Sequence, residues 1–107
     1  MEAEKDEILA KARAVKVTHQ AARQVLAELR SAREAQGLSL AAVQERSGIT
    51  REAISKLENS ESVNPTVLTL SRYALAVGKQ LSIGLVDYDP EGRPANGSRR
   101  NSHVREA

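Results

Sequence analysis

Residues 39–59 read SLAAVQERSGITREAISKLEN, and this stretch decides how the chain folds. Ser39 is a favoured helix N-cap residue, and the residues after it run without a break to Gly48, a residue that favours a left-handed helix stop. Thr50 supplies a second N-cap only two positions later. The stretch therefore predicts two short helices joined by a tight turn at Gly48.

The apolar spacing of this stretch indicates how the two helices pack. Four side chains are expected to face inward and hold the helices at a steep angle: Val43, Ile49, Ile54 and Leu57. The start of the second helix then projects from the body, a geometry that suits the major groove of DNA. The first helix would lie across the DNA backbone and offer its N-terminal amides and the Ser39 hydroxyl to a phosphate.

The flanking sequence predicts further helices and an all-α fold. Residues 18–36 carry apolar residues at the 3.6-residue period, with Thr18 as N-cap and Gly37 as stop, and residues 1–17 predict a short helix or frayed arm before them. Another helix is expected from Asn64-Pro65-Thr66 to Val77. An aromatic content of only 2% also favours a helical Ala/Leu/Val core over a sandwich or barrel.

The C-terminal part predicts one strand and a tail. Leu81, Ile83 and Leu85 alternate with Ser82 and Gly84 at the two-residue period of a half-buried strand. A lone strand needs a partner, and pairing with a second subunit is the simplest arrangement. We thus expect an arm (1–17), a helical domain (18–78), a dimerisation strand (79–88) and a disordered tail (89–107).

Composition limits the function classes. The 107 residues fit one small domain, cysteine is absent, and neither a secretory signal nor an apolar run of membrane-spanning length is present, so a cytoplasmic protein without membrane contact is expected. Residues 11–79 hold eleven basic and six acidic residues, which places the whole basic excess in the middle of the chain. No catalytic arrangement, metal site or cofactor motif is visible, so an enzyme is not expected.

Four blocks carry a family resemblance: RSAREAQGL (30–38), GITR (48–51), ISKLEN (54–59) and NPTVLTLSRYALAVG (64–78). Over residues 22–87 the chain resembles the Xre/Cro-like helix-turn-helix family and is most similar to HigA- or HipB-type antitoxins. The resemblance implies a lambda-repressor-like domain of four or five helices. It also implies a homodimeric transcriptional repressor that binds a palindromic double-stranded DNA operator, and an antitoxin that represses its own operon and neutralises a cognate toxin.

The resemblance also implies roles for individual residues. Arg51, Glu52 and Lys56 correspond to base-facing side chains, although a merely solvated helix face is the alternative. The other residues expected at the DNA are Ser39, Thr50, Ser55, Asn59 and Ser60. Arg33 and Glu58 correspond to a structural ion pair between the first helix of the domain and the end of the recognition helix.

Two departures from the family pattern leave another function open. The family usually has a polar residue where this chain has Leu40 and a small Ala where it has Gln44, and Glu52 and Glu61 add acidic charge near the proposed DNA face. A protein-interaction module that binds a toxin or another partner with little DNA binding is therefore an alternative, as is a stand-alone or phage-type regulator.

Leu68 and Leu75 raise a further question, because they fall where the family is usually polar. They either extend a dimer or partner surface or are covered by the N-terminal segment of the same chain.

Overall fold

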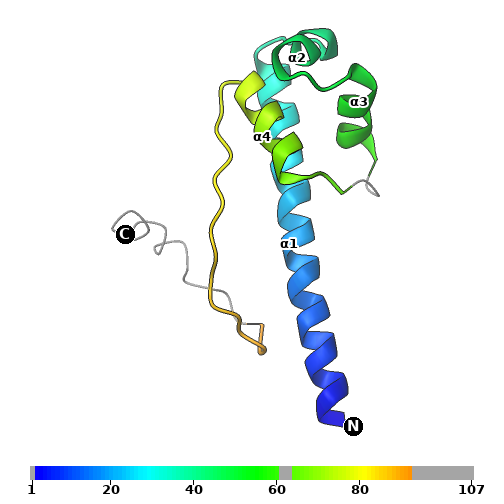
Figure 1. Cartoon of the computed structure of the whole chain (residues 1–107), viewed down its shortest axis with the longest axis vertical. Coiled ribbons are helices and arrows are strands. Elements are labelled where there is room, and N and C mark those ends of the chain that lie inside the picture. The colour runs from blue at the N-terminus through cyan, green and yellow to red at the C-terminus, as the bar shows by residue number, and fades with distance from the viewer. Residues whose placement is uncertain (1, 61–63, 93–107) are drawn as a thin grey trace, which may run out of the picture. The chain divides into compact units, whose positions relative to one another are not determined.

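The computed structural model describes residues 2–60 and 64–92, which hold four helices and no strand. The helices are α1 (Glu2–Ala35), α2 (Leu40–Ser47), α3 (Arg51–Asn59) and α4 (Val67–Ala76), shown in Figure 1. The chain divides into two compact units. Residues 19–81 form one of them, and residues 2–18 and 82–92 are the described part of the other.

The two short helices begin and end at the predicted residues. The Ser39 hydroxyl oxygen accepts a hydrogen bond from the Ala42 N–H at 3.0 Å, and the Thr50 hydroxyl oxygen accepts one from the Ala53 N–H at 3.1 Å. Gly48 has a φ of 78°, a left-handed conformation that glycine adopts without a steric penalty. Both predicted N-caps and the Gly48 stop are therefore confirmed.

One hydrophobic core holds the unit of residues 19–81 together. The four residues predicted to face inward, Val43, Ile49, Ile54 and Leu57, are all buried. The remaining buried members of this core are Leu26, Leu29, Leu70, Tyr73, Ala74, Ala76 and Val77. Because α1, α2, α3 and α4 all contribute to it, burial of apolar side chains fixes which faces of α2 and α3 stay outside.

The prediction that a helix begins at Thr18 is wrong. Helix α1 runs without interruption from Glu2 to Ala35, and the Thr18 hydroxyl donates to the Ala14 carbonyl at 3.4 Å inside it. Its sequence contains no Gly or Pro, and Val15, Val17 and Thr18 each lower helix stability by only a few tenths of a kcal/mol. These losses are too small to interrupt a helix that continues on both sides.

The predicted strand at residues 79–88 is not formed in the single chain. The backbone there has no strand assignment, since a strand requires a hydrogen-bonded neighbour. Leu81 packs against the core, whereas Ile83 and Leu85 are exposed. The predicted disordered tail spans residues 89–107, and residues 93–107 of it lie outside the described residues. In the described part, the Gly92 N–H donates to the Asp89 carbonyl at 3.0 Å and closes a turn.

Candidate nucleic-acid interface

Helix α3 presents its charged side chains away from the core. Arg51, Glu52 and Lys56 are exposed, while Ile54 and Leu57 on the other side of the helix are buried. Within the described part of the chain, none of these three charged side chains makes a hydrogen bond or ion pair. They are therefore available to an external partner, as recognition-helix side chains must be.

The starts of α2 and α3 add polar groups of another kind. The Ser39 and Thr50 hydroxyl oxygens accept from their own helices, so each hydroxyl keeps its hydrogen for donation to a ligand. The first backbone N–H groups of each helix also lack acceptors within that helix and favour negative charge nearby. The N-terminal ends of α2 and α3 are thus suited to phosphate contact.

Gln44 connects α2 to the first residue of α3. Its side-chain oxygen accepts from the Arg51 backbone N–H at 2.7 Å, which satisfies one of the unpaired donors at the start of α3. Sequence reasoning treated Gln44 only as a departure from the family pattern. The contact joins residues seven apart on two different helices, so helical periodicity could not reveal it. Leu40, the other departure, packs against the core.

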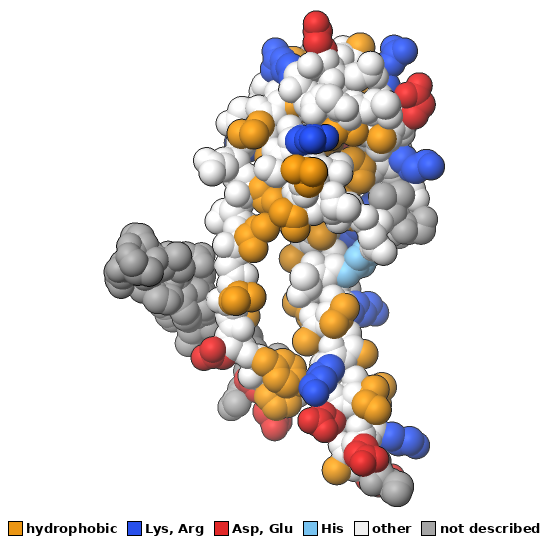
Figure 2. All heavy atoms as spheres, viewed as in Figure 1, with side chains coloured by type: hydrophobic (Ala, Val, Ile, Leu, Met, Phe, Trp, Pro, Cys, Tyr) orange, Lys and Arg blue, Asp and Glu red, His pale blue; other side chains and the backbone are white. Residues whose placement is uncertain are grey.

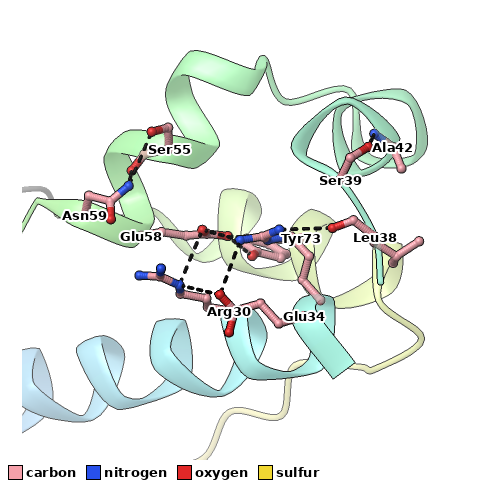
Figure 3. A network of polar contacts seen from close by, with 10 residues as sticks. Arg30, Glu34, Leu38, Ser39, Ala42, Ser55, Glu58, Asn59 and Tyr73 are labelled. Atoms are coloured by element: carbon pink, nitrogen blue, oxygen red, sulfur yellow. Dashed lines mark hydrogen bonds and ion pairs between the residues drawn. The ribbon is translucent and has the colours of Figure 1, made fainter. Parts of the chain in front are cut away.

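The remaining residues predicted to contact DNA lie at the C-terminal end of α3. The Asn59 side-chain amide donates to the Ser55 carbonyl at 2.9 Å and to the Ser55 hydroxyl at 3.3 Å, as Figure 3 shows. The Ser60 N–H donates to the Lys56 carbonyl at 2.9 Å and closes the helix. Ser55 and Asn59 therefore form one polar group at the C-terminal end of α3.

Arg33 and Glu58 form a bidentate ion pair beneath this surface. The Arg33 Nε and Nη2 atoms each donate to one Glu58 carboxylate oxygen at 2.9 Å, and Arg33 Nη1 donates to the Leu38 carbonyl at 3.0 Å. The Tyr73 hydroxyl also donates to Glu58 (Figure 3). The Arg33 side chain is only 14% exposed and that of Glu58 only 3%, so water competes little for these contacts.

This polar network joins three helices, since Arg33 lies on α1, Glu58 on α3 and Tyr73 on α4. The hydrogen bond to Glu58 raises the pKa of the Arg33 guanidinium, and burial together with Glu58 raises the pKa of the Tyr73 hydroxyl. Both groups therefore keep their protons at neutral pH and hold the carboxylate. Sequence reasoning missed Tyr73, although a buried tyrosine needs a hydrogen-bond partner, and this need could have indicated the contact.

The capped helix pair with a charged outer face defines a helix-turn-helix protein. A family model described as helix-turn-helix matches residues 29–83, which are 55 of the 107 residues. The chain belongs to this Xre/lambda-repressor-like helix-turn-helix family of DNA-binding transcription regulators. Comparison with curated proteins and with solved structures gave no match.

The described residues contain neither a membrane-spanning helix nor a cluster of metal-ligating side chains. None of their helices carries an apolar stretch long enough to cross a bilayer. Their His, Asp and Glu side chains do not gather in threes as a metal site would need.

Proposed function

We propose that the chain is a homodimeric, sequence-specific transcriptional repressor that inserts α3 of each protomer into the major groove of a palindromic operator. The observation that carries this proposal is the outer face of α3, where Arg51, Glu52 and Lys56 are exposed and have no side-chain partner among the described residues. Two recognition helices on one face of B-DNA would read half-sites about 34 Å apart, one helical turn.

Each polar residue of this face has a chemical role in the proposal. The Arg51 guanidinium donates to guanine O6 and N7, Glu52 accepts from a cytosine amine, and Lys56 contacts a neighbouring base or phosphate. The hydroxyls of Ser39 and Thr50 donate to phosphates. Those backbone contacts set the register of the protein on the duplex, and the base contacts supply the sequence preference.

The groups at the end of α3 complete the proposed backbone contacts. Ser55, Asn59 and Ser60 follow the charged face toward the C-terminal end of the helix. Because Asn59 is held by Ser55, its side-chain oxygen has a defined position from which to accept a hydrogen bond.

The homodimer is proposed to form through residues 79–88. Ile83 and Leu85 are exposed on a stretch with no strand partner among residues 2–60 and 64–92, and pairing with the same stretch of a second copy would satisfy both the backbone and these side chains. Ile83→Asp places a charge in that contact. We expect it to weaken dimerisation and operator binding together, as measured by sedimentation and by mobility shift.

We further propose that the protein is an antitoxin that represses its own operon. The support is the resemblance to HigA- and HipB-type antitoxins together with Leu68 and Leu75 of α4, both of which are exposed in the single chain and available to a toxin. Co-purification with the product of a gene in the same operon tests this assignment. A stand-alone or phage-type regulator would bind the operator without such a partner.

The DNA-binding proposal is tested by a mobility-shift titration with the DNA upstream of the gene, at two salt concentrations and with nonspecific competitor. We expect saturable binding that weakens steeply with salt, because bound phosphates release counterions. Arg51→Ala should relax the sequence preference by about 1–3 kcal/mol at one base position. Arg72→Ala on α4 removes the same charge from an exposed site outside α2 and α3 and is the matched control.

A protein-interaction module with little DNA binding is the second candidate function. Exposed Leu68 and Leu75 favour it, as does the acidic Glu52 on the proposed DNA face. No shift at either salt concentration would select this function over the repressor. Unchanged base preference in Arg51→Ala, with binding otherwise intact, would remove Arg51 from the recognition residues.

A further inference from the structure

The N-terminal half of α1 carries an uncovered apolar stripe. Ile8 is 66% exposed and Val15 70% exposed, and the exposed Ala12 lies between them at the spacing of four and three residues that aligns side chains on one face of a helix. Ala10, which faces the other way, is buried. Figure 2 shows hydrophobic side chains at the surface along this part of α1. The apolar side chains of this stripe are therefore exposed to solvent.

The apolar residues of the stripe have the spacing of a helix–helix interface. Apolar residues recur every seven positions along α1 at Ile8, Val15, Ala22 and Leu29, which is a heptad repeat. Leu29 is buried in the core of the unit of residues 19–81. At Ile8 and Val15 the same repeat is exposed and lacks a partner among the residues that the structure describes. A helical segment of this length is marginally stable in water without packing.

The charges of residues 2–16 indicate which partner covers the apolar stripe. Residues 2–7 contain four acidic residues and one lysine, whereas residues 11–16 contain three basic residues and no acidic one. Two copies side by side in the same direction would place acidic end on acidic end and basic part on basic part. Two copies in opposite directions keep the acidic ends apart and, with Ile8 opposite Val15, place Glu7 of each copy opposite Lys16 of the other.

We propose that residues 5–18 of α1 pair with the same residues of a second copy of this chain, in antiparallel orientation, with Ile8 of one copy opposite Val15 of the other. This register centres the stripe on itself, so that the apolar side chains of both copies are buried together. The contact adds a second dimer interface to the one proposed for residues 79–88 and is independent of DNA binding.

The first experiment compares two variants of the full chain by sedimentation equilibrium in the absence of DNA. Ile8→Asp/Val15→Asp should raise the dimer dissociation constant by at least about 10-fold, because it puts charges into the buried stripe. Val17→Asp is the matched control. Val17 is 63% exposed on the same helix but lies about 200° around it from Val15, so its substitution should leave the dissociation constant unchanged.

The second experiment measures orientation. The chain has no cysteine, so introduced thiols report on a single contact. An oxidised mixture of Ile8→Cys and Val15→Cys proteins should form the mixed disulfide faster than either variant links to itself, whereas a parallel pair would favour the self-linked products.

Two outcomes overturn the proposal. One is faster self-linking of the cysteine variants. The other is a dimer dissociation constant that Ile8→Asp/Val15→Asp moves no more than Val17→Asp does. Neither result affects the proposed function, since α3 and the Ile83 contact are unchanged in these variants. Loss of dimer in Ile83→Asp alone, with these variants unaffected, would place the whole interface at residues 79–88.

Discussion

Arg33→Met removes the two guanidinium donors to the Glu58 carboxylate, leaves the Tyr73 hydroxyl donor in place, and keeps an apolar stem of similar reach. The structure sets the magnitude, because Glu58 is only 3% exposed and cannot recover its lost partners from water. Removing one partner of a buried ion pair costs about 3–5 kcal/mol. The Tyr73 hydroxyl and Arg30, which lies 3.9 Å from the Glu58 carboxylate, remain and favour the lower end of that range. In a small domain this loss lowers the melting temperature by roughly 12 °C or more.

Lys11→Met is the matched control for this prediction. Lys11 also lies on α1 and pairs with Glu7 at 3.8 Å on the surface, where both side chains are exposed. An exposed pair of this spacing contributes about 0.3–0.5 kcal/mol. Urea unfolding followed by circular dichroism, at one fixed protein concentration, measures both variants.

A double variant separates the effect of charge from that of packing. Arg33→Met/Glu58→Gln contains no buried charge, and the side-chain oxygen of the introduced glutamine can still accept from Tyr73. It should recover at least half of the stability that the single variant loses. The reasoning is refuted if Arg33→Met costs no more than Lys11→Met, or if the double variant is as unstable as the single one.

Two further predictions concern the tyrosine and the turn. Because burial and Glu58 raise the pKa of Tyr73, the folded state keeps its proton above pH about 10, where the unfolded state loses it. Stability should therefore fall as the pH rises beyond about 10, and urea titrations should show a smaller fall in Tyr73→Phe. Gly48→Ala should lower stability by about 1–2 kcal/mol, because the φ of 78° penalises a Cβ even though the added atom meets nothing within 4 Å. An unchanged midpoint of urea unfolding in Gly48→Ala would show that the turn relaxes without cost.

Local patterns predicted the elements that local contacts form. The Ser39 and Thr50 hydroxyls reach N–H groups three residues ahead, and Gly48 adopts a conformation that most other residues avoid. The same reasoning failed at Thr18, because a favourable N-cap residue does not start a helix where the preceding residues are already helical. The strand at residues 79–88 could not form from local pattern alone, since its backbone bonds need a second segment.

The sequence by itself determined where α2 and α3 begin and which of their residues are buried, because these features depend on spacings of two to four residues. Only the tertiary structure decided what holds α3 in place. Glu58 meets Arg33 across 25 residues and Tyr73 across 15, and Gln44 reaches Arg51 from the neighbouring helix. The Arg33–Glu58 pair was expected only from family resemblance. No periodicity encodes such contacts, because they arise when helices that are distant in sequence pack around one core.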